Sequence, residues 1–186
     1  MTRWVVLAPT MPEPGLGAVR SAGPDLPGSV GGHGFSWDLD ADAAPELPTG
    51  AEAVALRPVR AAFVPLDGPR IKRTLLLTVR TGTSADVLAE FESDLLGMPE
   101  HIATIRSWAL SRVAERAGPA SPWTHVWEQE YATVEGLTGE YLLNPYHWAH
   151  VDRWFDGEVP GSIVEPGLAH VFRRSEPPVL TADDAD

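Results

Sequence analysis

Cysteine is absent from the 186-residue chain, which excludes disulfide frameworks, thiolate nucleophiles, zinc ribbons and cysteine-ligated iron–sulfur clusters. No apolar run approaches the ~20 residues that cross a bilayer, and Pro9 interrupts the first apolar run too early for a signal peptide. Basic residues are also few. The resulting net charge of −12 argues against a nucleic-acid partner, because phosphate binding needs a basic face. We therefore expect a cytoplasmic protein with no membrane and no nucleic-acid partner.

The composition is that of a folded globular chain, with 44% hydrophobic and 22% charged residues. The length suits one large domain or two small ones. Three segments differ in character. Residues 1–70 contain strands and loops without a convincing helix, residues 71–175 alternate strands and helices, and residues 176–186 form an acidic stretch that we expect to be a disordered tail.

In the N-terminal segment, short apolar or alternating runs are separated by loops. Arg3–Ala8 and residues 34–39 are typical of strands, and residues 53–66 predict one or two strands with Pro58 at an edge or a bulge. Residues 9–32 are rich in proline and glycine and lack hydrophobic periodicity, so we expect one long loop there.

From residue 71 onward the pattern predicts a ferredoxin-like β-α-β-β-α-β unit, and hence an α+β fold. Thr83-Ser84 begins the first helix, and we expect Gly97 and Pro99 to end it. The expected strands cover residues 71–80, 101–113, 123–131 and 167–173, and the later helices cover residues 133–143 and 146–155.

Two groups of residues in this unit could form a site. Trp123, His125 and Trp127 alternate along one strand and would place an aromatic wall with one titratable group on one face. Tyr141 and His147 flank a proline break between two helices, which would allow both side chains to reach one pocket. The same aromatic residues could instead fill a core or an interface.

The strand motif Trp123-Thr124-His125, followed by Tyr141, Pro145 and His147, resembles the stress-responsive dimeric α/β-barrel (Dabb) family. The usual family signature is Tyr-Thr-His on a strand and then Tyr-x-x-His-Pro-x-His. The resemblance covers residues 71–175. It implies two ferredoxin-like units that enclose a barrel with a mostly apolar cavity. Residues 1–70 would then be a degenerate half-repeat that pairs with the complete unit, or an extension that covers the barrel.

The resemblance also implies a chemistry, because the family includes a plant polyketide cyclase that performs an aldol condensation. Its acid–base pair corresponds to Tyr141 and His147, and its strand histidine corresponds to His125. The sequence departs from the family at Asn144, which replaces a histidine, and at Arg73, where a first-strand histidine is usual.

On this interpretation His147 and Tyr141 are the catalytic residues of a cyclase or lyase without a cofactor. Its substrate would be a small apolar or aromatic molecule, such as an aromatic or polyketide-type carbonyl compound. The expected substrate-binding residues are His125, Trp123, Trp127, Asn144 and Arg73. The alternative is a non-catalytic, stress-responsive module that binds a ligand or a partner.

Metal binding is a further alternative, since His147 and His150 could supply two ligands and His125 or Glu128 a third. Histidines three residues apart in a tryptophan-rich helix are more often packing residues than metal ligands. A single histidine is likewise weak evidence for a haem ligand. We therefore expect no metal and no cofactor.

A single ferredoxin-like sheet leaves one apolar face open. Leu75, Leu77, Trp123 and Trp127 are apolar side chains of the kind that such a face would have to bury. The cover would be a second copy of the chain, as the family resemblance implies, or the N-terminal strands of the same chain. We expect a homodimer. A solution mass of 20.1 kDa would instead favour the self-covered chain.

Overall fold

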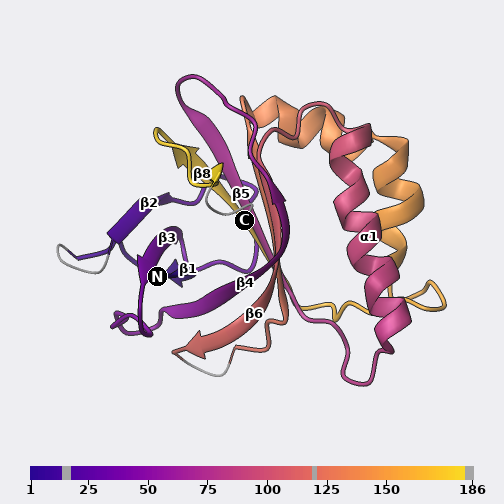
Figure 1. Ribbon diagram of the computed structural model, residues 1–186, viewed down its shortest axis with the longest axis horizontal. Coiled ribbons are helices and arrows are strands. Elements are labelled where there is room, and N and C mark those ends of the chain that lie inside the picture. Colours follow the sequence, from indigo (N-terminus) through magenta and orange to yellow (C-terminus); the bar gives the residue numbers. More distant parts are fainter. Residues whose placement is uncertain (14–17, 119–120, 183–186) are drawn as a thin grey trace.

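The strands of the computed structural model form one eight-stranded antiparallel sheet that curls into a nearly closed barrel (Figure 1). The structure describes residues 1–13, 18–118 and 121–182. The strand order is β2-β3-β1-β4-β6-β7-β5-β8. The strands are β1 (Thr2–Ala8), β2 (Ala18–Pro24), β3 (Phe35–Ala41), β4 (Glu52–Ala62), β5 (Arg70–Leu77), β6 (Trp108–Ala117), β7 (His125–Tyr131) and β8 (Ala169–Ser175).

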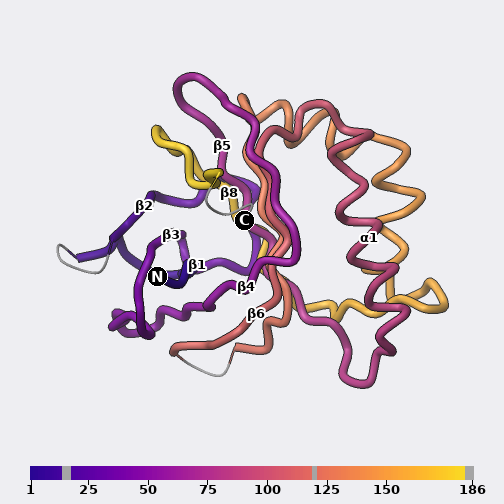
Figure 2. Tube along the Cα trace, viewed as in Figure 1, coloured from indigo at the N-terminus to yellow at the C-terminus, as the bar shows by residue number. Residues whose placement is uncertain are grey.

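The C-terminal half is the predicted ferredoxin-like unit. Helix α1 (Ala85–His101) connects β5 to β6, and a helical segment connects β7 to β8. The order β6-β7-β5-β8 places the first and last strands of the unit side by side, as in the ferredoxin fold. Figure 2 shows the helical segment after β7 running beside α1 on one side of the sheet. The α+β fold class and the ferredoxin-like unit are confirmed.

The N-terminal half completes the barrel within the same chain. Strand β4 pairs along its length with β6, with a register shift between Pro58 and Arg60, so Pro58 lies at the predicted bulge. At the other edge β2 meets β8, where the Ser21 and Ser175 hydroxyl oxygens lie 2.7 Å apart. The loop after β2 bonds to β8 as well, because Val30 N–H donates to the His170 carbonyl over 2.9 Å. The second face of the sheet is therefore covered by the chain's own N-terminal strands.

The two faces of the C-terminal sheet bury different apolar clusters. Leu75, Leu77 and Trp127 pack with Phe91 of α1 on the helix side. Trp123 packs inside the barrel with Val5, Leu7 and Val126, and thus does not share the face of Trp127 as the alternation predicted. The reason is that Trp123 precedes β7, so the two-residue period of the strand does not extend to it.

Charged side chains fill part of the barrel interior. Asp38 lies 3.7 Å from the Lys72 ammonium and 3.5 Å from the Arg3 guanidinium, and it accepts a hydrogen bond from Arg173. Glu128 accepts a 2.7 Å hydrogen bond from Lys72 and also pairs with Arg3. All five side chains are at most 8% exposed. Such charges are tolerated in an interior only when each one is paired.

Strand β2 lies where one long loop was expected over residues 9–32, so that expectation was wrong. The strand is an edge strand of small and polar residues, and its buried Ser21 is stabilised by a 2.9 Å hydrogen bond from Arg173 Nη1. A strand that is stabilised by long-range polar contacts has no alternation of apolar residues from which it could be predicted.

Helix α1 also differs from its expected end, because it continues through Gly97 and Pro99 to His101. Strand β6 consequently begins at Trp108, where a strand had been expected from residue 101. Packing of the helix on the sheet through Leu95 and Met98, which are fully buried, outweighs the local preference of proline and glycine for a helix end.

The expected disordered tail is ordered over residues 176–182. Val179 and Leu180 are buried, and the backbone N–H of Val179 donates to Glu130 Oε1 over 2.8 Å. Arg20 donates to the Val179 carbonyl over 3.1 Å. Val179 and Leu180 bury apolar surface, and the buried Glu130 carboxylate needs hydrogen-bond donors. These two contacts explain why the stretch packs against the barrel despite its acidic composition. Residues 183–186 lie outside the described part.

Candidate functional site

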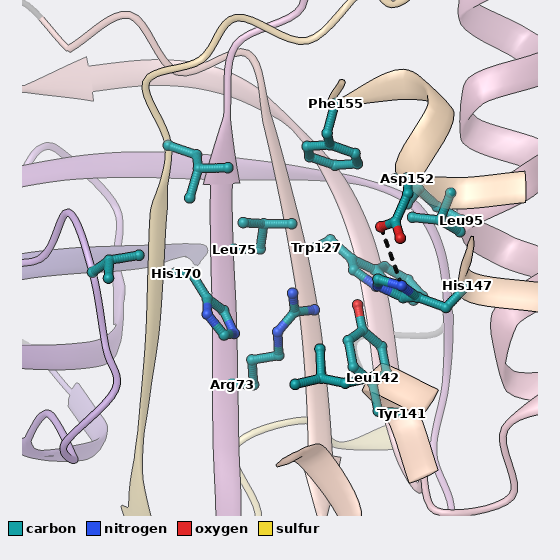
Figure 3. Close-up of a pocket in the computed structure, with 13 residues that line it drawn as sticks. Arg73, Leu75, Leu95, Trp127, Tyr141, Leu142, His147, Asp152, Phe155 and His170 are labelled. Carbon is teal, nitrogen blue, oxygen red and sulfur yellow. Dashed lines mark ion pairs between the residues drawn. The ribbon is translucent and has the colours of Figure 1, made fainter. Parts of the chain in front are cut away.

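A cavity of about 210 Å³ lies between the helix side of the sheet and the helical segment after β7 (Figure 3). Strands β5 and β7 supply Arg73, Leu75 and Trp127 to its wall, and the helical segment supplies Tyr141 and His147. Most of the other lining residues are apolar: Val30, Leu95, Leu142, Val151, Phe155 and Leu168, with Asp152 and His170 as polar members.

The helical segment is wound unevenly, and this winding shapes the site. It consists of two π-helical turns, η1 (Gly136–Tyr141) and η2 (His147–Val151), followed by the 3₁₀ turn η3 (Asp152–Trp154). In η2 the N–H of Asp152 bonds to the carbonyl of His147, five residues earlier. Residues five apart therefore lie on one side of this turn, whereas in an α-helix they would diverge.

This winding brings the His147 imidazole against a carboxylate. Nδ1 of His147 lies 3.2 Å from Asp152 Oδ1, within ion-pair distance but with the ring N–H off the line to the oxygen. The Nδ1 side is thus occupied, which leaves Nε2 for other chemistry. Burial lowers the pKa of His147 below the ordinary 6.5, Asp152 opposes that shift, and the Arg73 cation adds to it. His147 is consequently a neutral imidazole at pH 7.

Tyr141 is the second titratable group of the cavity. Its ring centroid lies 4.7 Å from that of His147, and the Arg73 guanidinium carbon lies 4.9 Å from the Tyr141 ring centre. Figure 3 shows the hydroxyl pointing between Arg73 and His147. Burial raises the pKa of Tyr141 above 10, Arg73 partly opposes the shift and Asp152 adds to it. The phenol therefore keeps its proton and can donate it.

Four of the residues singled out in the sequence thus meet in one cavity, namely Tyr141, His147, Arg73 and Trp127. The other three lie elsewhere. His125 faces α1, where Nε2 lies 3.2 Å from Glu92 Oε1. Trp123 is inside the barrel and donates from Nε1 to Glu52 over 3.0 Å. Asn144 lies at the break between the two helical turns.

Asp152 and His170 complete the polar part of the cavity, and neither residue was predicted from the sequence. Asp152 could be found only by expecting a π-helical turn, since it is five positions after His147. His170 is on β8 opposite Leu75. Burial and the neighbouring Arg73 cation lower the pKa of His170 to about 3, so it is uncharged at pH 7.

His150 does not join His147. Its side chain is half exposed, its ring stacks on Tyr146 at 4.5 Å, and its Nδ1 lies 3.9 Å from Asp94. Within residues 1–13, 18–118 and 121–182, no three His, Asp or Glu side chains are grouped so that they could hold a metal ion. In the same ranges no helix is long and apolar enough to cross a membrane.

The break between the two helical turns is fixed by Asn144. Its Nδ2 donates to the His101 carbonyl over 2.9 Å, and its Oδ1 accepts from the Tyr146 N–H over 2.9 Å. Tyr146 then lies flat against α1 and donates its hydroxyl to the Asp94 carbonyl over 3.1 Å. Gly97 permits this approach, because a Cβ at that position would overlap the Tyr146 hydroxyl oxygen.

Gly97→Ala is therefore expected to lower the melting temperature, although the same change in an ordinary helix stabilises by about 1 kcal/mol. The added methyl group would displace Tyr146 and with it the turn that carries His147. Gly139→Ala is the matched control, since nothing lies within 4 Å of a Cβ there. Thermal unfolding of both variants is the measurement. An unchanged or raised melting temperature for Gly97→Ala would contradict the packing argument.

Together, the fold and the cavity define the chain as an α+β barrel built from a single sheet, with a candidate site beside its ferredoxin-like unit. The profile of the family described as the stress-responsive A/B barrel domain (Dabb) matches residues 71–164. The chain belongs to this family, as its motifs indicated.

Two solved structures share the fold along most of the chain. A proposed monooxygenase from Lactobacillus acidophilus NCFM is 8% identical, with 93% of each chain covered and a TM-score of 0.56. A major regulator of staphylococcal pathogenesis is 7% identical, with 91% of this chain and 97% of that chain covered and a TM-score of 0.50. A dimeric ferredoxin-like protein of unknown function from Bacteroides fragilis is 17% identical over 57% of this chain and 95% of its own, with a TM-score of 0.40. No curated protein matches the sequence.

Proposed function

We propose that this chain binds a small aromatic or polyketide-type carbonyl compound in the cavity and acts on it as a cyclase or lyase without a cofactor. The observation that carries the proposal is the meeting of a neutral imidazole and a protonated phenol in one apolar cavity. Their ring centroids lie 4.7 Å apart, and both side chains line the cavity. A base and a donor of this kind are the groups that proton abstraction next to a carbonyl requires.

In the proposed reaction, Nε2 of His147 takes a proton from the carbon next to the substrate carbonyl. The electron pair moves to the carbonyl oxygen, where the Tyr141 hydroxyl donates a hydrogen bond to the developing enolate. The enolate carbon then attacks a second carbonyl of the same molecule, and the His147 imidazolium returns its proton to the new alkoxide, which restores the neutral imidazole. Asp152, beside Nδ1, stabilises the imidazolium while it holds the proton.

The size of the cavity limits the substrate. Its volume of about 210 Å³ is below the ~300–1,000 Å³ of most ligand sites. A single ring or a short acyl chain fits this space. The indole of Trp127 and the ring of Phe155 would contact its apolar part.

The test is deuterium exchange into the methyl group of acetophenone in D₂O, followed by proton NMR. We expect exchange faster than in protein-free buffer, and we expect the enzyme-dependent rate to rise with pH through the pKa of His147, which burial places below 6.5. Activity is lost as the pH falls through that value, because the imidazolium cannot accept a proton. Asp152→Asn removes the group that opposes the shift, so its acid limb should move to lower pH. If the pH at which activity is lost is the same in Asp152→Asn and in the wild-type chain, the pairing of His147 with Asp152 is contradicted.

The alternative, a non-catalytic module that binds a ligand or a partner, predicts binding to the cavity with no exchange above the background. A cytoplasmic location and a homodimer also stay predictions. Because the N-terminal strands already cover the second face of the sheet, a homodimer would have to use another surface.

We also propose that residues 1–70 are a degenerate half-repeat. Support comes from the strand order, since β2-β3-β1-β4 repeats the order β6-β7-β5-β8 of the complete unit. In the described residues no helix connects β1 to β2 or β3 to β4, so the half-repeat would have lost both helices.

A further inference from the structure

Arg73 is a buried cation in the wall of an apolar cavity. Its side chain is 5% exposed. Nη1 donates to Gln129 Oε1, which also accepts a 2.9 Å hydrogen bond from the Tyr131 hydroxyl. Nε has no hydrogen-bond partner in the described residues. The guanidinium is therefore held in place by neutral groups and keeps an unused donor.

The other cations that the fold buries are treated differently. Lys72 and Arg173 on the inner face are paired with Asp38 or Glu128, and Arg70 lies 3.6 Å from Glu130. For Arg73 no carboxylate lies within 4.0 Å in the parts of the chain that the structure describes. An unpaired charge in an apolar setting is costly, and a chain that pairs its other buried cations leaves this one open to an external anion.

The neighbours of Arg73 in the cavity do not neutralise it. Burial keeps the pKa of the Tyr141 phenol high, and His170 is uncharged with a pKa of about 3. Asp152 is the one carboxylate in the cavity wall, and it lies against His147 with half of its side chain exposed to solvent. None of the side chains that contact the guanidinium in the described residues therefore carries a negative charge.

We infer that Arg73 binds a carboxylate group of the ligand, which makes the ligand class small monocarboxylic acids with one aromatic ring or a short acyl chain. This inference names the charged group of the proposed substrate. Binding of a carboxylate by Arg73 does not depend on the proposed reaction, whereas turnover of the bound acid does. A guanidinium donates two parallel N–H groups to a carboxylate, whereas a neutral amide of the same shape accepts at one oxygen.

The test compares benzoate with benzamide, a neutral probe of nearly the same size, by calorimetric titration at pH 7. The wild-type chain is expected to bind benzoate at least ~10-fold more tightly, the usual advantage of a charge-assisted hydrogen bond. In Arg73→Gln the ratio should fall to about one. Arg57→Gln removes the same charge at an exposed position and should keep the wild-type ratio.

Equal binding of the two probes by the wild-type chain, no binding of benzoate, or an unchanged ratio in Arg73→Gln would each overturn the inference. The wild-type comparison decides the matter even if Arg73→Gln does not fold. Failure of the proposed function is recognised separately. A wild-type chain that prefers benzoate but exchanges no deuterium would refute the proposed reaction, and the carboxylate site would still be supported.

Discussion

His147→Ala is expected to lower the rate of the proposed proton transfer by about 10²–10⁴-fold, the usual contribution of one general acid–base group. The imidazole is a neutral base beside the Tyr141 ring, and the Asp152 carboxylate lies 3.2 Å from its Nδ1. Methyl exchange of acetophenone, measured per folded molecule, reports the loss. Where the total acceleration is smaller than this factor, the rate should fall to the buffer background.

Two further variants make the result specific. Tyr141→Phe removes one donor to the enolate and should cost about 10²–10³-fold. His150→Ala removes a half-exposed histidine that stacks on Tyr146 and lies outside the cavity wall, so exchange should be unchanged. A His147→Ala variant that has a lower melting temperature but full activity would refute the catalytic role and favour a structural one.

Asp38→Asn is expected to destabilise the fold by about 3–5 kcal/mol, because it leaves buried cations without one of their carboxylates. Asp38 is 2% exposed and lies between Lys72, Arg173 and Arg3. Urea denaturation gives the free energy of unfolding. Asp40→Asn is the control two residues along the same strand, since Asp40 is about one-fifth exposed and pairs with Arg20 over 2.7 Å. Its cost should stay below about 1 kcal/mol.

The Asp38 carboxylate also makes the stability of the fold depend on pH in the acid range. Burial by itself would raise the pKa of Asp38, but Lys72, Arg173 and Arg3 outweigh burial and lower the pKa below 3.8. The pKa is thus lower in the folded chain than in the unfolded chain. Its contribution to stability is complete above the unfolded value and is lost as the pH falls through the folded one. Asp38→Asn should therefore flatten the fall in stability below about pH 4. An equally steep fall in the variant would show that other groups set the limit.

Much of the C-terminal half could be predicted from the sequence because its elements carry their own periodicity. The strand at β5 and the helix face of Phe91 and Leu95 are read directly from apolar spacing. Tyr141 and His147 were predicted to converge because a proline break lies between them, and the structure places their rings 4.7 Å apart.

Elements that depend on contacts between residues far apart in the chain could not be predicted from local sequence patterns. Strand β2 depends on Arg173, more than 150 residues away, and the docked tail depends on the Glu130 carboxylate. Gly97 and Pro99 suggest a helix end by local preference, and only the packing of Tyr146 on α1 shows why Gly97 lies within the helix. Asp152 was missed for a different reason, because the expected helix period was 3.6 residues and the turn is wider.

The presence of helices on only one half of the barrel has a consequence for stoichiometry. A barrel made of two equal halves would repeat its cavity by symmetry, and the two cavities could influence each other through the shared sheet. Here the wall that carries Tyr141 and His147 comes from the helical segment after β7, and in the described residues the first half has no counterpart to it. Each chain then offers one equivalent of binding, with a hyperbolic saturation curve and a Hill coefficient of about one.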